Sequence, residues 1–577
     1  MNMYTYTLLF SKYLAVFILS IIFLACSNSP EANCDQSCLE DQICLDGVCV
    51  ILPGEEDLDG DSDGNGTTDG DNTYEDGDGD VTSNCDLEIC DDECVDTSSN
   101  PLHCGSCGNE CPYGSCSDSS CIEVCDPLAT PFGGGEGSSQ VPHLLCAPNH
   151  LVELSKNEAY LDRYFRLVSN IDLDGISFKP IGSEETPFSG LFDGAGFEIR
   201  NLFIDLPEQD YVGFFGFLSE NSLIYNLRFL NADITGRNYT GVLAGASETN
   251  LTDISVIGVI MGHEYVGGLT GELTAEGTSK SIEVDVLVTG FNNVGGVAGA
   301  LSGSISETNA ISILNPTIIE DLDNEKFGGI VGECRDGSLD QITSTSTLRE
   351  IGRSAGGIAG YFLRCSLTSS NFYTNSTTNP AGNGIGGAIG RCRNSEIEKT
   401  KGYLQLTSLF PILTVGGIAG FSSQCSLSEI DIEVSIDINS GISGADIGGV
   451  LGRGASSTVV NNVISRGNAS ASIRVGGVSG STSETTIGDV VSLVSINAQN
   501  SAGGLIGYVI FGTTVENSYW HELLSGQSQS AGGGLGLSTS QMANQATFVG
   551  FDFDNVWIMD DEKGHPVLRW VQELDND

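Results

Sequence analysis

A glycine-rich string recurs along this chain at a nearly fixed interval. One copy reads Tyr265-Val266-Gly267-Gly268-Leu269-Thr270-Gly271. From Gly216 to Gly507 the copies span 291 residues in ten intervals, a mean period near 29 with intervals of 26 to 33. A repeat of this length decides the fold before any other feature does. The eleven copies end at Gly216, Gly245, Gly271, Gly299, Gly332, Gly360, Gly390, Gly420, Gly452, Gly480 and Gly507.

The segments between the strings alternate between apolar and polar residues. One such segment has Ile282, Val284, Val286 and Val288 at every second position, and another has Ile430, Ile432, Val434, Ile436 and Ile438. Period-two alternation predicts strands with one buried face and one mostly acidic face in water. With about three short strands in each period, the sequence predicts an all-β fold, a right-handed parallel β-helix (β-solenoid) of about 12 coils. We expect glycine at the corners because a corner needs positive φ and close backbone approach.

These strings resemble the GLUG motif of bacterial surface proteins, in the filamentous-haemagglutinin and IgA-peptidase-like setting. Residues 165–173 and 188–197 resemble the coils that precede such arrays, and Ser518-Tyr519-Trp520 resembles the matching exit. The segment after it contains Met542, Phe548, Trp557, Pro566 and Trp570, and we expect it to cap the open end of the coils. The resemblance implies surface exposure and adhesion.

Charge is distributed unevenly along the 577 residues. The chain has 77 Asp plus Glu against 23 Lys plus Arg, for a net charge of -54; residues 1–150 carry 28 acids and one base. So few bases cannot neutralise a phosphate backbone, which excludes nucleic acids as partners. The predicted organisation is a signal peptide (1–25), a small Cys-rich module (26–54), a disordered acidic Asp/Gly linker (55–82), a second Cys-rich module (83–127), a linker with an N-terminal cap (128–164), the β-helix (165–515) and an aromatic-rich capping segment (516–577).

The N-terminus predicts export and a lipid anchor. The apolar run from Tyr13 to Ala25 has the length of a signal-peptide core. Phe23-Leu24-Ala25-Cys26 resembles a bacterial lipoprotein box, in which the Cys is lipidated and becomes the new N-terminus. Because Ser27 rather than Asp follows, this resemblance implies the outer membrane, with the protein surface-exposed. The alternative is an ordinary secretory signal with Cys26 in a disulfide.

Export into an oxidising compartment predicts disulfides for the other 18 Cys residues. They form three even sets, and small modules with little apolar content need such covalent links. In the third set, four consecutive coils place Cys two or five residues after the string, which predicts the cross-coil pairs Cys334–Cys365 and Cys392–Cys425, with buried free thiols as the alternative. The first two sets are Cys34, Cys38, Cys44 and Cys49, and then Cys85, Cys90, Cys94, Cys104, Cys107, Cys111, Cys116, Cys121, Cys125 and Cys146.

Two motifs suggest metals, and neither is complete. Residues 94–112 resemble the CVDT…CGxCGxxC repeat of secreted and surface proteins of myxobacteria and their relatives. Within it Cys104-x2-Cys107 has the spacing of half a zinc site, although the oxidising compartment favours disulfides. In the linker, Asp59, Asp61 and Asp63 begin like a calcium loop, but Gly70 replaces the closing Glu. We therefore expect no cofactor beyond diffuse Ca²⁺ binding in the linker.

The residues favour a non-enzymatic, lipid-anchored cell-surface rod, an adhesin that binds a glycan or a surface protein. No catalytic residues are evident, and the six His are isolated and expected at surface or loop positions. The alternative is a polysaccharide lyase or glycoside hydrolase on the same scaffold. An exposed aromatic ladder on one face would favour glycan binding, whereas a cleft with converging acids and a Lys or Arg would favour the enzyme.

Overall fold

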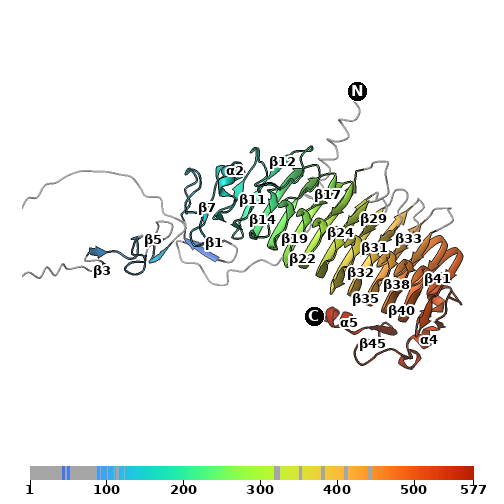
Figure 1. Cartoon of the computed structure of the whole chain (residues 1–577). Helices are drawn as coiled ribbons and strands as arrows, with labels where there is room; N and C mark the ends of the chain where they lie inside the picture. Colours follow the sequence, from blue (N-terminus) through green and yellow to red (C-terminus); the bar gives the residue numbers. More distant parts are fainter. Residues whose placement is uncertain are drawn as a thin grey trace, which may run out of the picture. The chain divides into compact units, whose positions relative to one another are not determined.

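The computed structural model describes residues 42–45, 48–51, 87–90, 93–100, 102–109, 111, 116–121, 124–317, 325–349, 354–377, 384–408, 414–438 and 445–576. The chain divides into two units, residues 1–83 and 84–577. The first contains one hairpin, in which β1 (Gln42–Leu45) pairs antiparallel with β2 (Val48–Ile51). The second begins with two small hairpins and continues into the solenoid (Figure 1). These hairpins are β3 (Glu88–Cys90) with β4 (Glu93–Val95), and β5 (Cys116–Ser117) with β6 (Ser120–Cys121).

The repeated region is a parallel β-solenoid of about 12 turns, as the sequence predicts. A typical coil has three strands: β17 (Glu264–Gly267), β18 (Thr270–Leu273) and β19 (Thr278–Gly290). Each strand pairs in parallel with its equivalent in the next coil. Among the described residues these strands form one 27-stranded sheet and one 11-stranded sheet.

The 11-stranded sheet, hereafter the narrow sheet, contains the strand that follows each glycine pair. Its strands in order are β13 (Phe215–Leu218), β15 (Ala244–Ser247), β18, β21 (Ala298–Leu301), β24 (Val331–Arg335), β27 (Ala359–Leu363), β31 (Ile389–Arg393), β34 (Ala419–Ser423), β37 (Leu451–Ala455), β39 (Ser479–Ser483) and β41 (Ile506–Phe511).

The 27-stranded sheet, hereafter the wide sheet, contains the long strand and the short strand of each coil. The long strands are β14 (Leu223–Thr235), β16 (Leu251–Met261), β19, β22 (Ser304–Pro316), β25 (Ser338–Arg349), β28 (Ser366–Thr368) with β29 (Ser370–Thr377), β32 (Glu396–Ser408), β35 (Ser426–Ile438), β38 (Thr458–Gly476) and β40 (Thr485–Gly503). The short strands are β17, β20 (Asn292–Gly295), β23 (Lys326–Gly328), β26 (Ser354–Gly356), β30 (Gly384–Gly386), β33 (Thr414–Gly416) and β36 (Asp446–Gly448).

The predicted alternation is confirmed on the long strands, with one correction. Ile282, Val284, Val286 and Val288 of β19 are all buried, and so are Ile430, Ile432, Val434, Ile436 and Ile438 of β35. Asp431 of β35, however, is only 4% exposed rather than in water, because Arg466 of the next coil forms an ion pair with it.

The string glycines allow close backbone approach, as predicted, but they do not have the predicted positive φ. In the string of β17 and β18, a Cβ on Gly267 would collide with the carbonyl of Thr270, and one on Gly268 with the carbonyl of Gly296 in the next coil. None of these string glycines has positive φ. Positive φ occurs instead at non-glycine positions, and one column of them follows the long strands, where all the residues are polar. The column is Asn226, Asp253, Ser281, Glu307, Gln341, Ser369, Lys399, Glu429, Asn462, Asp489 and Asn517.

Aromatic residues and a helix close the N-terminal end of the core. Phe165, Phe188, Phe192, Phe214 and Phe215 are fully buried in the first coils. Helix α2 (Pro148–Lys156) buries Leu151 and Leu154 in the same core. The remaining elements here are β7 (His143–Leu145), η1 (Glu158–Tyr160), β8 (Tyr164–Leu167), β9 (Ile171–Asp172), β10 (Leu191–Asp193), β11 (Glu198–Arg200) and β12 (Phe203–Asp205).

The C-terminal segment covers the end of the main core, as predicted, and also forms a second core against the last long strands. Trp520 joins the main core at its end, where its ring lies against Gly504. The rest packs beside the last long strands, β38 and β40 (Figure 1). Trp557 lies in a second core with Ile464 and Val491, and its indole donates to Asn462 over 3.0 Å. The elements are β42 (Thr514–Glu516), β43 (Tyr519–His521), α3 (Glu522–Ser525), β44 (Leu535–Leu537), α4 (Thr539–Met542), η2 (Gln545–Thr547), β45 (Trp557–Asp560), β46 (His565–Leu568) and α5 (Arg569–Asn576).

Candidate functional site

The cysteines of the solenoid are paired across coils. Cys334 of β24 is bonded to Cys365, and Cys392 of β31 to Cys425. These are the two pairs expected from the sequence. In the front section the structure joins Cys90 to Cys107, Cys104 to Cys116, Cys111 to Cys121 and Cys125 to Cys146. Six disulfides among the described residues indicate an extracytoplasmic location.

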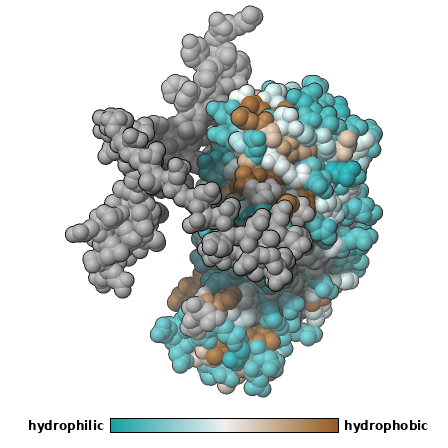
Figure 2. Space-filling view, turned by 90° about the vertical axis from the view of Figure 1, so that its left-hand side faces the viewer, coloured by the Kyte–Doolittle hydropathy of each residue, from teal (hydrophilic) through white to brown (hydrophobic). Residues whose placement is uncertain are grey.

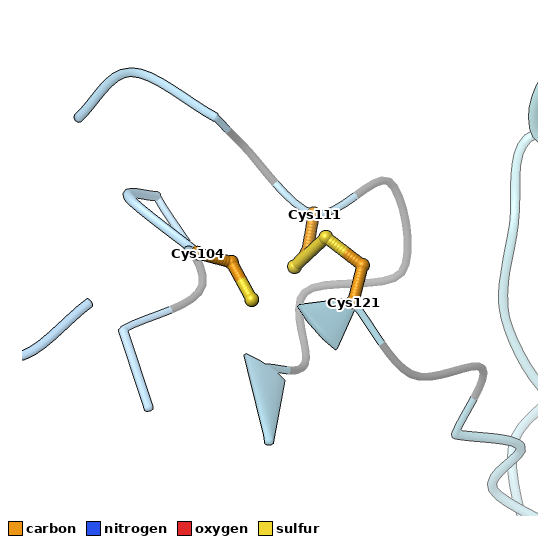
Figure 3. A group of neighbouring side chains, drawn as sticks. All are labelled: Cys104, Cys111 and Cys121. Atoms are coloured by element: carbon orange, nitrogen blue, oxygen red, sulfur yellow. A yellow bond between two sulfur atoms is a disulfide. The ribbon is translucent and has the colours of Figure 1, made fainter. Parts of the chain in front are cut away.

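Cys104 and Cys107, whose spacing resembles half a zinc site, belong to two separate disulfides. Cys104 and Cys107 bond to different partners, Cys116 and Cys90. The sulfurs of Cys104, Cys111 and Cys121 lie within 4.8 Å of one another, and Figure 3 shows Cys111 and Cys121 joined beside Cys104. Because all three are oxidised, they offer no thiolate to a metal.

Several predicted sites lie outside the described residues. They are Cys26 with its lipoprotein box, Cys34, Cys38, Cys85 and the calcium candidates Asp59, Asp61 and Asp63. The backbones of Cys44 and Cys49 face each other in the hairpin of β1 and β2, and Cys94 lies in β4. Within the described ranges, no helix is both long and apolar enough to cross a bilayer.

Two histidines are not at the surface, contrary to expectation. His150 of α2 is fully buried; its Nδ1 accepts from the backbone of Cys146, and its Nε2 lies 3.2 Å from the carbonyl of Ala129. Burial lowers the pKa of His150. His521 is 6% exposed and caps α3 by accepting from the backbone of Leu524. Both contacts are structural, since each ring contacts a helix end or a turn.

Two rows of side chains run along the solenoid on either side of the glycine pairs. The corner row holds the residue just before the apolar residue of each short strand. The strand row holds the residue just after the last glycine of each string, on the narrow sheet. The corner row is Tyr211, Tyr239, Tyr265, Asn293, Lys326, Ser354, Gly384, Thr414, Asp446, Arg474 and Ser501. The strand row is Phe217, Ala246, Glu272, Ala300, Glu333, Tyr361, Arg391, Phe421, Arg453, Ser481 and Tyr508.

The two rows contact each other, and we call them together the row face. The rings of Tyr211 and Phe217 lie 5.7 Å apart, centroid to centroid. Lys326 Nζ lies 2.8 Å from the carboxylate of Glu333. A Cβ at Gly384 would lie 3.0 Å from Cγ of Arg391, so the side chain of Arg391 covers this glycine. The row face is therefore one continuous surface in register, with one residue pair per coil.

Three tyrosines of the corner row form a stack along the solenoid axis. Tyr211 and Tyr239 have ring centroids 4.7 Å apart, and Tyr239 and Tyr265 have centroids 4.6 Å apart, with nearly parallel planes. All three are half-buried and have positive φ between 55° and 58°. Because the rings stack on one another, they present their edges to solvent. An open ring face is to be expected only at the ends of the stack, and the row continues from Tyr265 to the smaller Asn293.

A cavity of about 550 Å³ opens where the tyrosine stack ends. Both rows line it, with Tyr265, Asn293 and Lys326 on one side and Glu272 and Glu333 on the other; Arg335 of β24 also lines it. Glu333 is only 4% exposed, and it holds Lys326 at 2.8 Å and Arg335 at 2.5 Å. Lys326 also donates to Asn293 over 3.1 Å. The cavity thus combines an aromatic ring, a fixed ion-pair cluster and amide groups.

Burial raises the pKa of two groups around this cavity, Glu272 and Tyr265. Burial, followed by the charge of Glu248, raises the pKa of Glu272. Burial also raises the pKa of Tyr265, with Glu333 and Glu272 adding to the effect. The tyrosines remain neutral hydrogen-bonding groups at physiological pH.

The row face is not evident from the sequence because it is marked by position rather than by residue type. Aligning the eleven strings would have shown three Tyr in succession before the first glycines, and charged or aromatic residues directly after the last ones. Only the stacking of coils shows that these two columns contact each other.

Other hollows and patches lie away from the row face. One cavity of about 680 Å³ near the N-terminal coils is lined by Asp174, Asp205, Asp233 and Lys179. Apolar side chains also show on the wide sheet, where Ile257 and Ile311 are 39% and 48% exposed. Figure 2 shows a mostly hydrophilic surface on one side of the molecule, interrupted by separate hydrophobic patches. The 680 Å³ cavity also has aromatic rings in its lining, those of Phe178 and Phe203, but no ion pair among the described residues joins its charges as in the cavity of the row face.

Comparison with known proteins gives local similarity only. Halomucin of Haloquadratum walsbyi is 32% identical over 165 residues, which is 26% of this chain and 2% of that protein. The "Putative Gly-rich membrane protein" of Evansella cellulosilytica is 31% identical over 139 residues, 23% of this chain and 16% of that protein. The chain thus spans less than a fifth of the length of either relative.

No protein-family model matches the chain. A solved structure from Bacteroides ovatus, titled a "putative immunoglobulin A1 protease", aligns over 76% of this chain and 95% of its own, with 16% identity and a TM-score of 0.22. An alignment at this score carries no argument about activity. The GLUG-like strings therefore stand as a motif resemblance.

Proposed function

We propose that this protein is a non-enzymatic, lipid-anchored component of the cell outer membrane that binds an extended glycan along the row face. The observation that carries the proposal is the cavity at Tyr265. A ring at the end of a stack, beside amide and ion-paired groups, is the combination that packs the apolar face of a sugar and hydrogen-bonds its hydroxyls.

The shape of the row face supports an extended ligand. Its residue pairs recur once per coil, about 4.8 Å apart, so a polymer lying along it meets a new pair at each step. The disulfides support an extracytoplasmic position, and the printed name of the Evansella relative, a Gly-rich membrane protein, agrees with placement at a membrane. A protein partner of the row face remains the alternative ligand.

The competing candidate is a polysaccharide lyase or glycoside hydrolase. Glu272 favours it, because burial raises the pKa of this carboxyl as a general acid requires. The other carboxylate of the cavity, Glu333, is held by two cations and is poorly suited to act as a base or nucleophile. We therefore rank binding above catalysis.

A glycan array probed with the purified full-length protein, followed by a reducing-sugar assay on each ligand bound, tests the proposal. We expect binding without turnover. Tyr265→Ala should weaken binding about tenfold, the loss of one stacking contact of about 1.4 kcal/mol, while Tyr265→Phe should retain it.

The matched control is Tyr373→Ala. Tyr373 also stacks on a tyrosine, Tyr403, at 5.3 Å, but it lies on the wide sheet. Equal losses in Tyr265→Ala and Tyr373→Ala, or no bound glycan at all, would refute the proposal. Turnover that Glu272→Gln abolishes while binding persists would establish the enzyme instead.

A further inference from the structure

Lys326 of the corner row contacts both a side-chain amide and a buried carboxylate. Its Nζ lies 3.1 Å from Oδ1 of Asn293 and 2.8 Å from Oε2 of Glu333. Asn293 belongs to β20 and Lys326 to β23, which pair in parallel, so the two residues lie one coil apart in the same row. Glu333 belongs to β24 of the strand row. An amine, an amide and a carboxylate from two adjacent coils therefore meet at one atom.

All three groups are shielded from water. Asn293 is 1% exposed, Glu333 is 4% exposed, and the side chain of Lys326 is 18% exposed. The ring of Tyr361 lies beside the lysine, with its centroid 5.9 Å from Nζ. Because burial keeps water from the amide, the amine of Lys326 is the nucleophile that the structure places beside it.

Lysine gives this cluster a chemistry that an arginine would not. Asp431 and Asp446 are also buried carboxylates, and they pair with Arg466 and Arg474. A guanidinium does not lose its proton in proteins, whereas a lysine ammonium can become a neutral, nucleophilic amine. The cluster of Lys326 therefore has a possible reaction, and the two arginine pairs do not.

Glu333 is placed to take a proton from Lys326. Its Oε2 already accepts a hydrogen bond from Nζ, so the proton moves within an existing contact. Two cations occupy Glu333 and keep it from acting on a ligand, but one of them is the proton donor of this reaction. The other, Arg335, lies 2.5 Å from Oε1 and holds the carboxyl group in position.

We propose that Lys326 and Asn293 form an intramolecular isopeptide bond, a covalent link between two coils of the solenoid. The structure shows the hydrogen-bonded arrangement from which this bond forms. The product is an amide between Nζ of Lys326 and Cγ of Asn293, and Glu333 is the group that moves the protons.

The reaction is balanced by the loss of ammonium. Lys326 gives one proton to Glu333, and the lone pair of the neutral Nζ forms a bond to Cγ of Asn293. Glu333 passes this proton to Nδ2 and then takes a second proton from Nζ. The Cγ–Nδ2 bond breaks as the C=O bond re-forms, and its electron pair leaves with the nitrogen as ammonia. Ammonia takes the second proton and departs as ammonium, so Glu333 is a carboxylate again and no oxidant or other reactant is consumed.

The bond extends the covalent links between coils. It joins the coil of β20 to that of β23 and β24, and the disulfide from Cys334 to Cys365 joins the latter to the next coil. Three successive coils are then linked, one pair of them by an amide that thiols do not reduce. Such a cross-link stabilises a fold chiefly by restricting the unfolded chain.

Mass spectrometry of the purified full-length protein, reduced and alkylated, tests the proposal. Trypsin cuts after free lysine and after arginine, and Lys280, Lys326 and Arg335 are the successive bases in this stretch. We expect the peptide 281–335, uncut at Lys326 and lighter by about 17 Da, the mass of the ammonia lost. A protease that cuts after glutamate should release residues 284–307 and 326–333 as one linked species.

Variants assign the three roles. Lys326→Arg should abolish the link while keeping a cation beside Glu333, and it is the variant that least disturbs the fold. Asn293→Ala should also abolish the link, and Glu333→Gln should reduce the linked fraction about tenfold or more because the proton acceptor is lost. Circular dichroism checks that each variant is folded.

The matched control is Glu272→Gln. Glu272 lines the same cavity, but no ion pair among the described residues joins it to Lys326, so this variant should retain the link. Equal loss of the link in Glu272→Gln and Glu333→Gln would overturn the role of Glu333.

Two other results would overturn the bond itself. One is a pair of peptides of unmodified mass, cut after Lys326. The other is a loss of about 17 Da that persists in Lys326→Arg, because it would come from attack on Asn293 by its own backbone. The test involves no glycan, so its result does not depend on the proposed function.

Discussion

At the scale of single residues, the tyrosine stack holds an unusual backbone conformation. Tyr211, Tyr239 and Tyr265 have positive φ, which bulky residues rarely adopt and which costs about 1–2 kcal/mol. Each ring pair returns about 0.5–1.5 kcal/mol through offset stacking, and the rings bury apolar surface in addition. The backbone strain is therefore offset by ring stacking and apolar burial that a smaller residue would not provide.

Because of the stack, the free energy of unfolding should fall at high pH. Burial, followed by the charge of Glu272, raises the pKa of Tyr239 from 10.0 to about 12. Above pH 10 the unfolded chain loses its phenolic protons first, so the stability present below pH 10 falls as the pH rises toward 12. We expect urea denaturation at pH 9 and 11.5 to show a smaller drop in Tyr239→Phe, by about 1 kcal/mol at most after solvent screening. A drop no smaller than that of Tyr373→Phe would contradict this assignment.

At the scale of elements, the glycine pair sets how closely coils stack. A Cβ on Gly329 would collide with the backbone carbonyl of Gly357 in the next coil. Backbone cannot yield as a side chain does, and a Cβ would meet the equivalent carbonyl of the next coil at Gly268, Gly296, Gly387, Gly417 and Gly449 as well.

We therefore expect Gly329→Ala to lower the free energy of unfolding by about 2–4 kcal/mol. Gly488→Ala is the matched control, because its Cβ would meet only the side-chain end of Asn461 at 2.9 Å and should cost below about 1 kcal/mol. Chemical denaturation followed by circular dichroism measures both. Equal losses would show that the glycine pair is not what limits the spacing.

The sequence predicts elements better than it predicts the site. Period and alternation located the buried faces of β19 and β35, because a stacked strand repeats the same requirement in each coil. The offsets after the glycine strings anticipated Cys334 with Cys365 for the same reason. Three features were not predicted from the sequence: positive φ on polar residues such as Ser281, the burial of Asp431 against Arg466, and the contact between the two rows. Each depends on which side chains of neighbouring coils meet, and a one-dimensional pattern does not contain that.

At the scale of the whole molecule, the solenoid converts a short sequence motif into a long surface. Each coil adds one residue pair to the row face, and the pairs change along it from stacked tyrosines to ion-paired clusters and arginines. The long hydrophobic core keeps the rows in register without help from a ligand. A preformed linear surface of this kind suits a polymer, because little is lost in ordering the protein when the ligand binds.

The most direct measurement is the dissociation constant of the bound glycan as a function of its chain length, by calorimetry on size-separated fragments. We predict that affinity rises with length until the ligand spans Tyr265 to Arg474, seven coil steps or about 34 Å along the axis. A dissociation constant already at its limit for one or two sugar units, and unchanged for longer fragments, would contradict it.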